Sequence, residues 1–115
     1  MSNQRLWAKI IGIVLLLVGV LGFFMGSGNY NLLSIFGVNM MHSVVHLVTG
    51  AIFAWAGFSK SAPVKKVNKW LGVIYIIVGI VGFFGVLSFL NVNMADNWLH
   101  LVVGVVSALI GWTSR

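Results

Sequence analysis

Four long apolar runs limit what this chain can fold into. They cover about Leu6–Met25, Met40–Phe58, Trp70–Leu87 and Ala95–Trp112. A helix rises 1.5 Å per residue and needs about 20 residues to cross a hydrocarbon core of about 30 Å, which is close to the length of each run. Only helices and closed barrels satisfy their own backbone in lipid, and the runs lack the strict alternation of barrel strands. The runs therefore predict four transmembrane helices.

The composition supports the same conclusion. Hydrophobic residues make up 60% of the 115 residues and charged residues 7%, whereas a soluble domain has about 25% charged residues. The hydrophobic core that a soluble domain of 115 residues can form is too small to hide so much apolar surface from water. We predict an all-α integral membrane four-helix bundle, a single transmembrane domain over residues 1–115 with the lipid bilayer around it.

The charged residues predict the orientation of the bundle. The net charge is +6, and the basic residues lie before the first run, between the second and third runs, and at the end of the chain: Arg5, Lys9, Lys60, Lys65, Lys66, Lys69 and Arg115. Positive residues favour the cytoplasmic side, so we expect a multi-pass protein of the cell (inner) membrane with both termini cytoplasmic. Nucleic-acid binders carry more Lys and Arg on one solvated face, so no nucleic-acid partner is expected.

The second half of the sequence repeats the first. Val18–Phe24 matches Val78–Phe84 at a shift of 60 residues (18 to 78), and His46–Val48 matches His100–Val102 at a shift of 54 (46 to 100). Each repeat holds two of the predicted helices, so the two repeats run in parallel about an axis along the membrane normal. The equivalent residues His46 and His100 are then expected at the same depth.

The predicted repeats cover about residues 7–58 and 69–112, and their small residues predict how the helices pack. Ten glycines recur at helical spacing: Gly12, Gly19, Gly22, Gly50, Gly57, Gly72, Gly79, Gly82, Gly104 and Gly111. Small residues let transmembrane helices approach closely. The faces also suit docking of a second copy (a homo-oligomer) or of a larger membrane protein. We therefore predict a packing or interaction module.

All three histidines and the only acidic residue are predicted in the outer leaflet. His42 and His46 form one i, i+4 pair and Asp96 and His100 form another, so each pair lies on one helix face. Together they predict a metal site for zinc, iron, nickel or copper. Thioethers nearby favour Cu(I); they belong to Met25, Met40, Met41 and Met94.

Other uses of this cluster remain open. His46 and His100 suit the two axial positions of a haem, if their helices are diagonal neighbours and Gly19, Gly22 and Gly79 (with Gly82) leave room for the porphyrin. The same residues suit an ion or proton pathway, or hydrogen-bonded ties between helices. The cofactor is therefore unknown at this level.

Two motifs resemble those of a known family. Asn39–Leu47 contains Asn-x-x-His-x-x-x-His-Leu, and Ala95–Leu101 contains Ala-Asp-Asn-x-x-His-Leu. With these motifs the chain resembles, over almost its whole length, a bacterial family of small four-helix membrane proteins known as a domain of unknown function. The resemblance implies the architecture but no activity, cofactor or partner. Met40-Met41 departs from the Asn-Pro-like helix start typical of that family.

Signatures of common enzymes are missing from the sequence. It contains no phosphate-binding loop, no HExxH and no GxSxG motif, and one Asp alone cannot form a carboxylate pair. We therefore predict a protein that is not an enzyme.

Overall fold

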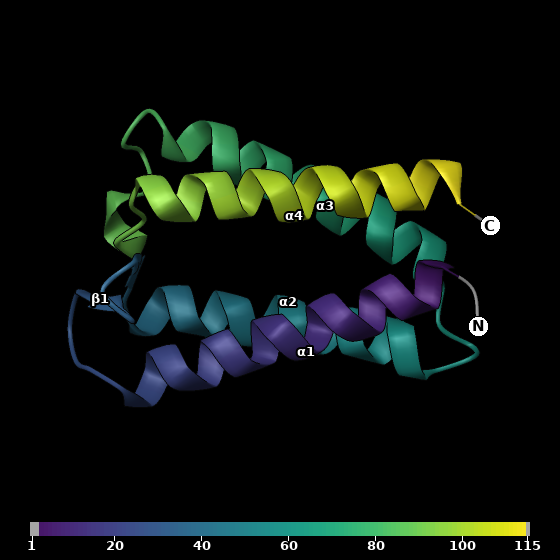
Figure 1. Ribbon diagram of the computed structural model, residues 1–115, viewed down its shortest axis with the longest axis horizontal. Coiled ribbons are helices and arrows are strands. Elements are labelled where there is room, and N and C mark those ends of the chain that lie inside the picture. Colours follow the sequence, from purple (N-terminus) through teal and green to yellow (C-terminus); the bar gives the residue numbers. More distant parts are fainter. Residues whose placement is uncertain (1–2, 115) are drawn as a thin grey trace.

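Four helices run side by side along the 40 Å axis of the molecule (Figure 1). The computed structural model describes residues 3–114. Its elements are α1 (Asn3–Phe24), β1 (Tyr30–Leu32), β2 (Phe36–Val38), α2 (Met40–Phe58), α3 (Val64–Gly82), the one-turn 3-10 helix η1 (Ser88–Leu90) and α4 (Met94–Thr113). The four-helix, all-α prediction is confirmed. The antiparallel hairpin β1–β2, which pairs Tyr30 with Val38, was not predicted.

Three helices, α1, α2 and α4, are long and apolar enough to cross a membrane. Helix α3 has the same length as α2, 19 residues, but carries lysines in its first two turns. It covers Val64–Gly82, whereas the sequence placed an apolar span over 70–87. The helix begins directly after Pro63, which has no backbone N–H to donate. It ends at Gly82 because the next residues form turns, and Gly85 adopts a φ of +74°.

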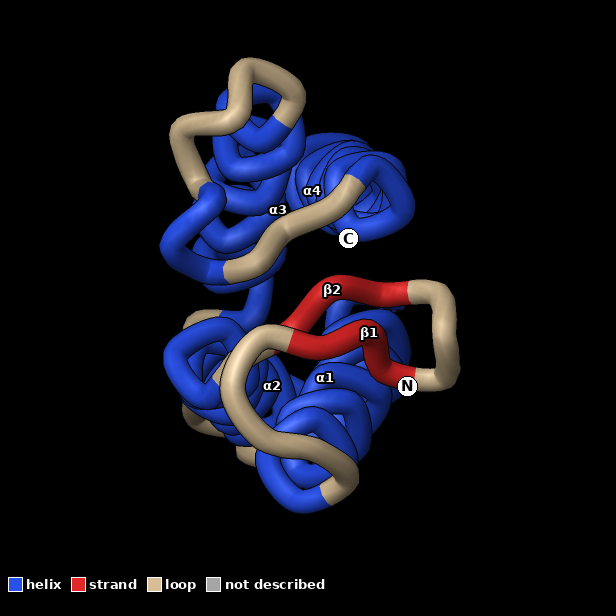
Figure 2. Tube along the Cα trace, turned by 90° about the vertical axis from the view of Figure 1, so that its left-hand side faces the viewer, coloured by secondary structure: helices blue, strands red, loops and turns tan. Residues whose placement is uncertain are grey.

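The helices associate as two pairs, α1 with α2 and α3 with α4 (Figures 1 and 2). Within each pair glycines bring the backbones into contact. A Cβ on Gly50 would lie 2.8 Å from the Leu16 nitrogen, and a Cβ on Gly104 would lie 2.5 Å from the Ile76 nitrogen. Each of the ten glycines named above packs on the partner helix of its own pair. These glycine faces therefore pack against helices of the same chain.

Side chains rather than backbones fill the interface between the two pairs. Its apolar core includes Phe53, which is fully buried, and Leu15 and Val103. Near the chain termini this interface becomes polar. Gln4 accepts a 2.9 Å hydrogen bond from Asn68 Nδ2, and Trp7 Nε1 donates to Ser107 Oγ at 2.8 Å.

At the opposite end, asparagines connect the two pairs. Asn39 caps α2 and donates from Nδ2 to the Phe89 carbonyl at 2.8 Å. Asn93 caps α4 and donates from Nδ2 to the Ile35 carbonyl at 2.9 Å. Asn91 Nδ2 also donates to carbonyls of the hairpin. These bonds fix the first turns of α2 and α4 relative to each other, and the histidines lie in and just after those turns.

Both ends of the described chain and the α2–α3 connection lie at one end of the bundle (Figure 1). The basic residues of these segments therefore gather there. Arg5 Nη1 donates to the Ala56 carbonyl at 2.8 Å, and Nη2 donates to the Lys60 carbonyl at 2.8 Å, so Arg5 holds the end of α2. Arg115, which contributed to the predicted orientation, lies outside the described residues.

Candidate metal site

Helix α2 presents two histidines to the interface between the pairs. Its start is fixed by Asn39, whose side-chain oxygen accepts a 2.9 Å hydrogen bond from the His42 backbone N–H. His42 therefore lies in the first turn, and His46 follows one turn later on the same face. Both side chains are buried, each 2% exposed. Their ring centroids lie 4.4 Å apart.

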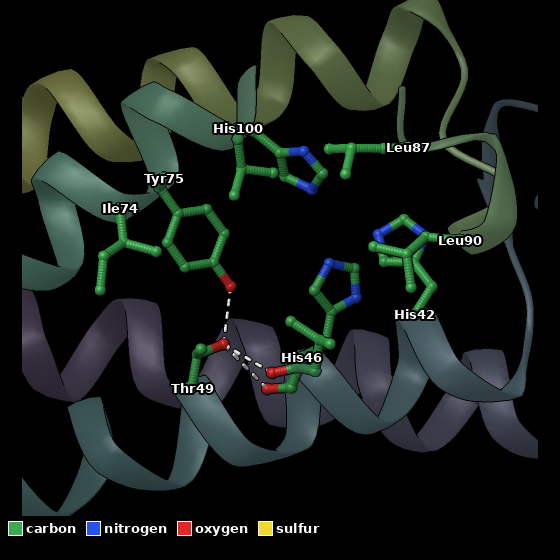
Figure 3. A pocket seen from close by; sticks show the side chains of 10 residues that line it. His42, His46, Thr49, Ile74, Tyr75, Leu87, Leu90 and His100 are labelled. Carbon is green, nitrogen blue, oxygen red and sulfur yellow. Dashed lines mark hydrogen bonds between the residues drawn. The ribbon is translucent and has the colours of Figure 1, made fainter. Parts of the chain in front are cut away.

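Helix α4 supplies the third histidine from the other pair. The His100 ring centroid lies 5.6 Å from that of His42 and 5.9 Å from that of His46. One ring nitrogen from each of the three residues lies within 4.8 Å of the others. The three imidazoles point into the same space between α2, α3 and α4 (Figure 3).

Most of these ring nitrogens have no hydrogen-bond partner. Both nitrogens of His42, both of His46 and Nδ1 of His100 are buried and unpaired. The backbone of Leu90 and Gly37 lies beside the His42 ring and interacts with it, at a geometry outside that of a regular hydrogen bond. An unsatisfied buried polar group costs about 1–3 kcal/mol, so this cluster of nitrogens is suited to hold a bound ion or ordered water. The three imidazoles form no hydrogen bond with one another.

The residues that could have tied the histidines have other partners. Thr49 Oγ1 lies 2.6 Å from the Tyr75 hydroxyl and also donates to the Val45 carbonyl. Ser107 accepts the hydrogen bond from Trp7. The imidazoles therefore remain available for coordination.

The donor set fits a transition-metal ion. Imidazole nitrogens bind zinc at about 2.0–2.1 Å, which places two nitrogens of a tetrahedral site about 3.3 Å apart. In the structure the three ring nitrogens lie within 4.8 Å of one another, which allows separations longer than 3.3 Å. The rings must therefore move slightly closer together to bind an ion. Imidazole is a ligand for zinc, copper, iron and nickel. Three histidines thus form most of one coordination sphere.

Asp96, the carboxylate of the predicted three-histidine, one-carboxylate set, is not among the residues whose ligand atoms lie within 4.8 Å of one another. Its Oδ2 accepts a 2.9 Å hydrogen bond from the Asn93 backbone N–H, and its own N–H donates to Asn93 Oδ1 at 2.9 Å. This reciprocal pair is a capping box at the start of α4. The carboxylate is only 1% exposed, and its position in the first turn directs it to the helix end.

The space expected for a haem is filled. A Cβ on Gly19 would lie 2.8 Å from Leu47, and a Cβ on Gly79 would lie 2.7 Å from Leu101, so these glycine faces hold the partner helix. Gly22 and Gly82 likewise pack on their partner helices. His46 and His100 face each other, but the glycines leave no slot for a porphyrin among the described residues.

The thioethers do not reach the site either. The four methionines of the described chain are exposed: Met25 58%, Met40 66%, Met41 55% and Met94 57%. None of them lines the pocket into which the histidines point. The argument for Cu(I) therefore loses its basis, because that argument required sulfur close to the imidazoles.

The pocket also contains residues that were not among the predicted site residues. It holds about 80 Å³ and is lined by the three histidines together with Thr49, Tyr75 and apolar side chains. The Tyr75 ring lies 5.6 Å from the His100 ring. Tyr75 is the only hydroxyl-bearing residue of the run Trp70–Leu87. An isolated hydroxyl in an apolar run was the sequence feature that could have marked Tyr75 as part of a site. Nothing in the sequence indicated that it faces His100.

Fold and site together define a class: a small bundle of two glycine-packed helix pairs, with apolar helices and a buried three-histidine cluster between the pairs. The chain belongs to the family DUF4383, described as a domain of unknown function, whose profile matches residues 5–113. Searches of curated proteins and of solved structures gave no match. The family has no assigned activity, so the function is argued from the site.

Proposed function

We propose that the chain is a non-enzymatic, multi-pass membrane protein that binds one divalent transition-metal ion through His42, His46 and His100. One observation carries this proposal: five buried, unpartnered imidazole nitrogens converge from two separate helix pairs. Zinc fits best among the candidates, because it accepts three imidazoles in a tetrahedral site and needs neither sulfur nor a porphyrin.

The outer surface of the bundle supports insertion into a bilayer. Large apolar side chains are exposed on different helices, for example Leu17 (57%), Ile77 (53%) and Val102 (58%). Helix α1 has 22 residues, which corresponds to about 33 Å, the thickness of a hydrocarbon core. Helix α3 packs along α4, and its lysines lie at the end where the termini lie, so we assign it as the fourth span.

The basic end supports a cytoplasmic location for both termini. Lys and Arg favour the cytoplasmic side, and the basic residues of the described chain lie in the terminal segments and around the α2–α3 connection. In this orientation the histidines lie in the outer leaflet of the cell membrane, one to two turns from the outer ends of α2 and α4. A metal bound there would reach the protein from the non-cytoplasmic side.

Metal titration of the purified protein tests the proposal. The protein carries an affinity tag without histidines, is purified in mild detergent, stripped with a chelator and titrated with Co²⁺. We expect one ion per chain and the intense visible absorption of four-coordinate cobalt, which Zn²⁺ then displaces. His46→Ala and His100→Ala should each weaken binding by about 100-fold or more, beyond the 10–100-fold typical of residues that only support ligands.

Met41→Leu is the matched control, because Met41 is close in sequence to the ligands but lies outside the pocket. It should change cobalt affinity less than about threefold. Cobalt binding without stoichiometry, or unchanged binding in His46→Ala and His100→Ala proteins that still melt cooperatively, would refute the metal site.

The other predicted roles have less support. The glycine faces are occupied within the chain, so a homo-oligomer or a complex with a larger membrane protein would have to use other surfaces. An ion or proton pathway and the absence of enzymatic activity stay predictions.

A further inference from the structure

We propose that the metal keeps one coordination position open on the pocket side, and that this position binds a small monodentate anion from outside the protein. The inference rests on the proposed metal site and names the class of ligand that the site would take. Sites with three protein ligands characteristically leave a fourth position for water or another small ligand.

Among residues 3–114, no fourth side-chain donor stands ready beside the three histidines. Asp96 is the only acidic residue of the chain, and its carboxylate is held in the capping box of α4. The chain has no Cys, and no described Met lines the pocket. The hydroxyls of Thr49 and Tyr75 bond to each other. Any further ligand must therefore come from outside.

The pocket provides the space for such a ligand. Its volume of about 80 Å³ lies directly in front of the three imidazoles. A water molecule occupies about 30 Å³ in the liquid, so the pocket has room for about two or three water-sized groups in all. The remaining walls are apolar: Val45, Ile74, Val78, Leu87 and Leu90. Val45 (41% exposed) and Ile74 (49% exposed) form its outer rim between α2 and α3.

The charge balance selects an anion over a neutral ligand. Three neutral imidazoles leave the full double positive charge on the ion, and apart from Thr49 and Tyr75 the other residues that line the pocket are apolar. Burying an uncompensated charge is costly, and an anion on the open position halves the net charge. The size of the pocket then favours a compact or linear anion over a branched or aromatic one.

Azide binding to the cobalt-loaded protein tests this inference. We expect azide to shift the visible absorption of the bound cobalt in a saturable manner, with one azide per ion, and benzoate to cause no shift. Val78→Phe fills the pocket with an aromatic ring and should retain cobalt while weakening azide binding by about tenfold or more. Ile74→Trp at the rim provides a second variant in case Val78→Phe does not fold.

Val102→Phe is the matched control, since Val102 lies exposed on α4 outside the pocket. It should leave azide affinity unchanged. Cobalt that binds to the wild-type protein but never responds to azide, or pocket variants with wild-type azide affinity, would overturn this inference and leave the metal site intact. Absence of cobalt binding would overturn both.

Discussion

The pairs α1–α2 and α3–α4 share a scaffold but differ in the residues that reach the site. Gly50 and Gly104 make equivalent backbone contacts, and Asn39 and Asn93 each cap a helix and bond across to the other half. The difference that most affects the histidine cluster lies at the third residue of each helix. It is His42 in α2 and Asp96 in α4, and each donates its backbone N–H to its capping asparagine at 2.9 Å.

This single exchange shapes the metal site. The Asp96 carboxylate accepts the backbone N–H of Asn93 and so turns to the helix end. The His42 side chain makes no such bond, and its imidazole lies with His46 and His100 instead. One pair therefore supplies two of the clustered histidines and the other supplies one. The comparison teaches that two repeats with a shared scaffold can form a site with an open side.

The same asymmetry appears deeper in the interface. Tyr75 and Thr49 share a 2.6 Å hydrogen bond. Their equivalents in the repeat, at shifts of 60 and 54 residues, are Leu15 and Val103, which are buried and apolar. The pocket thus lies on the polar side of an interface whose other side is a plain hydrophobic core.

The largest effect is expected from substitutions that disrupt the close helix packing shared by the two pairs. Gly50→Val and Gly104→Val each force a side chain into the backbone of the partner helix, and we expect each to lower the free energy of unfolding by about 3 kcal/mol. Denaturation in mixed micelles measures the loss. Val48→Ala, at a position 53% exposed, is the control and should have a small effect. A tolerated valine at one position only would contradict the equivalence of the two pairs.

An intermediate effect sharpens the contrast between His42 and Asp96. Asp96→Ala removes the capping box and should reduce the stability of the metal-free protein by about 1 kcal/mol, with cobalt affinity within about threefold of wild type. His42→Ala should do the opposite: about 100-fold weaker cobalt binding, with little change in metal-free stability. Equal losses of cobalt affinity in the two variants would place Asp96 among the ligands and refute this assignment.

The smallest effect concerns the hydroxyl pair beside the site. Tyr75→Phe leaves Thr49 without its side-chain partner and should cost about 0.6–1 kcal/mol of stability. The double variant Tyr75→Phe, Thr49→Val places two apolar groups where the other half has Leu15 and Val103. It should be less destabilised than the sum of the single variants. Strict additivity in this double-mutant cycle would show that the two hydroxyls do not interact.

Much of the architecture was accessible from the sequence. Apolar runs of membrane-spanning length predicted the helices, and glycines at helical spacing predicted faces for close packing. The separation of His42 and His46 by four residues placed both on one face of α2. These inferences depend on the period of a helix, which is set by local backbone geometry and needs no knowledge of neighbours.

The composition of the site depended on the tertiary structure. Spacing along a helix says which side chains share a face, but not which faces meet or what fills the space between them. Asp96 could serve as ligand or as cap, and only the hydrogen bonds of the first turn of α4 decided between the two. The glycines expected to admit a porphyrin hold the partner helix instead. The sequence determined the membrane-suited helices and the histidine pair, while packing between elements far apart in the chain decided which side chains meet the histidines and line the pocket.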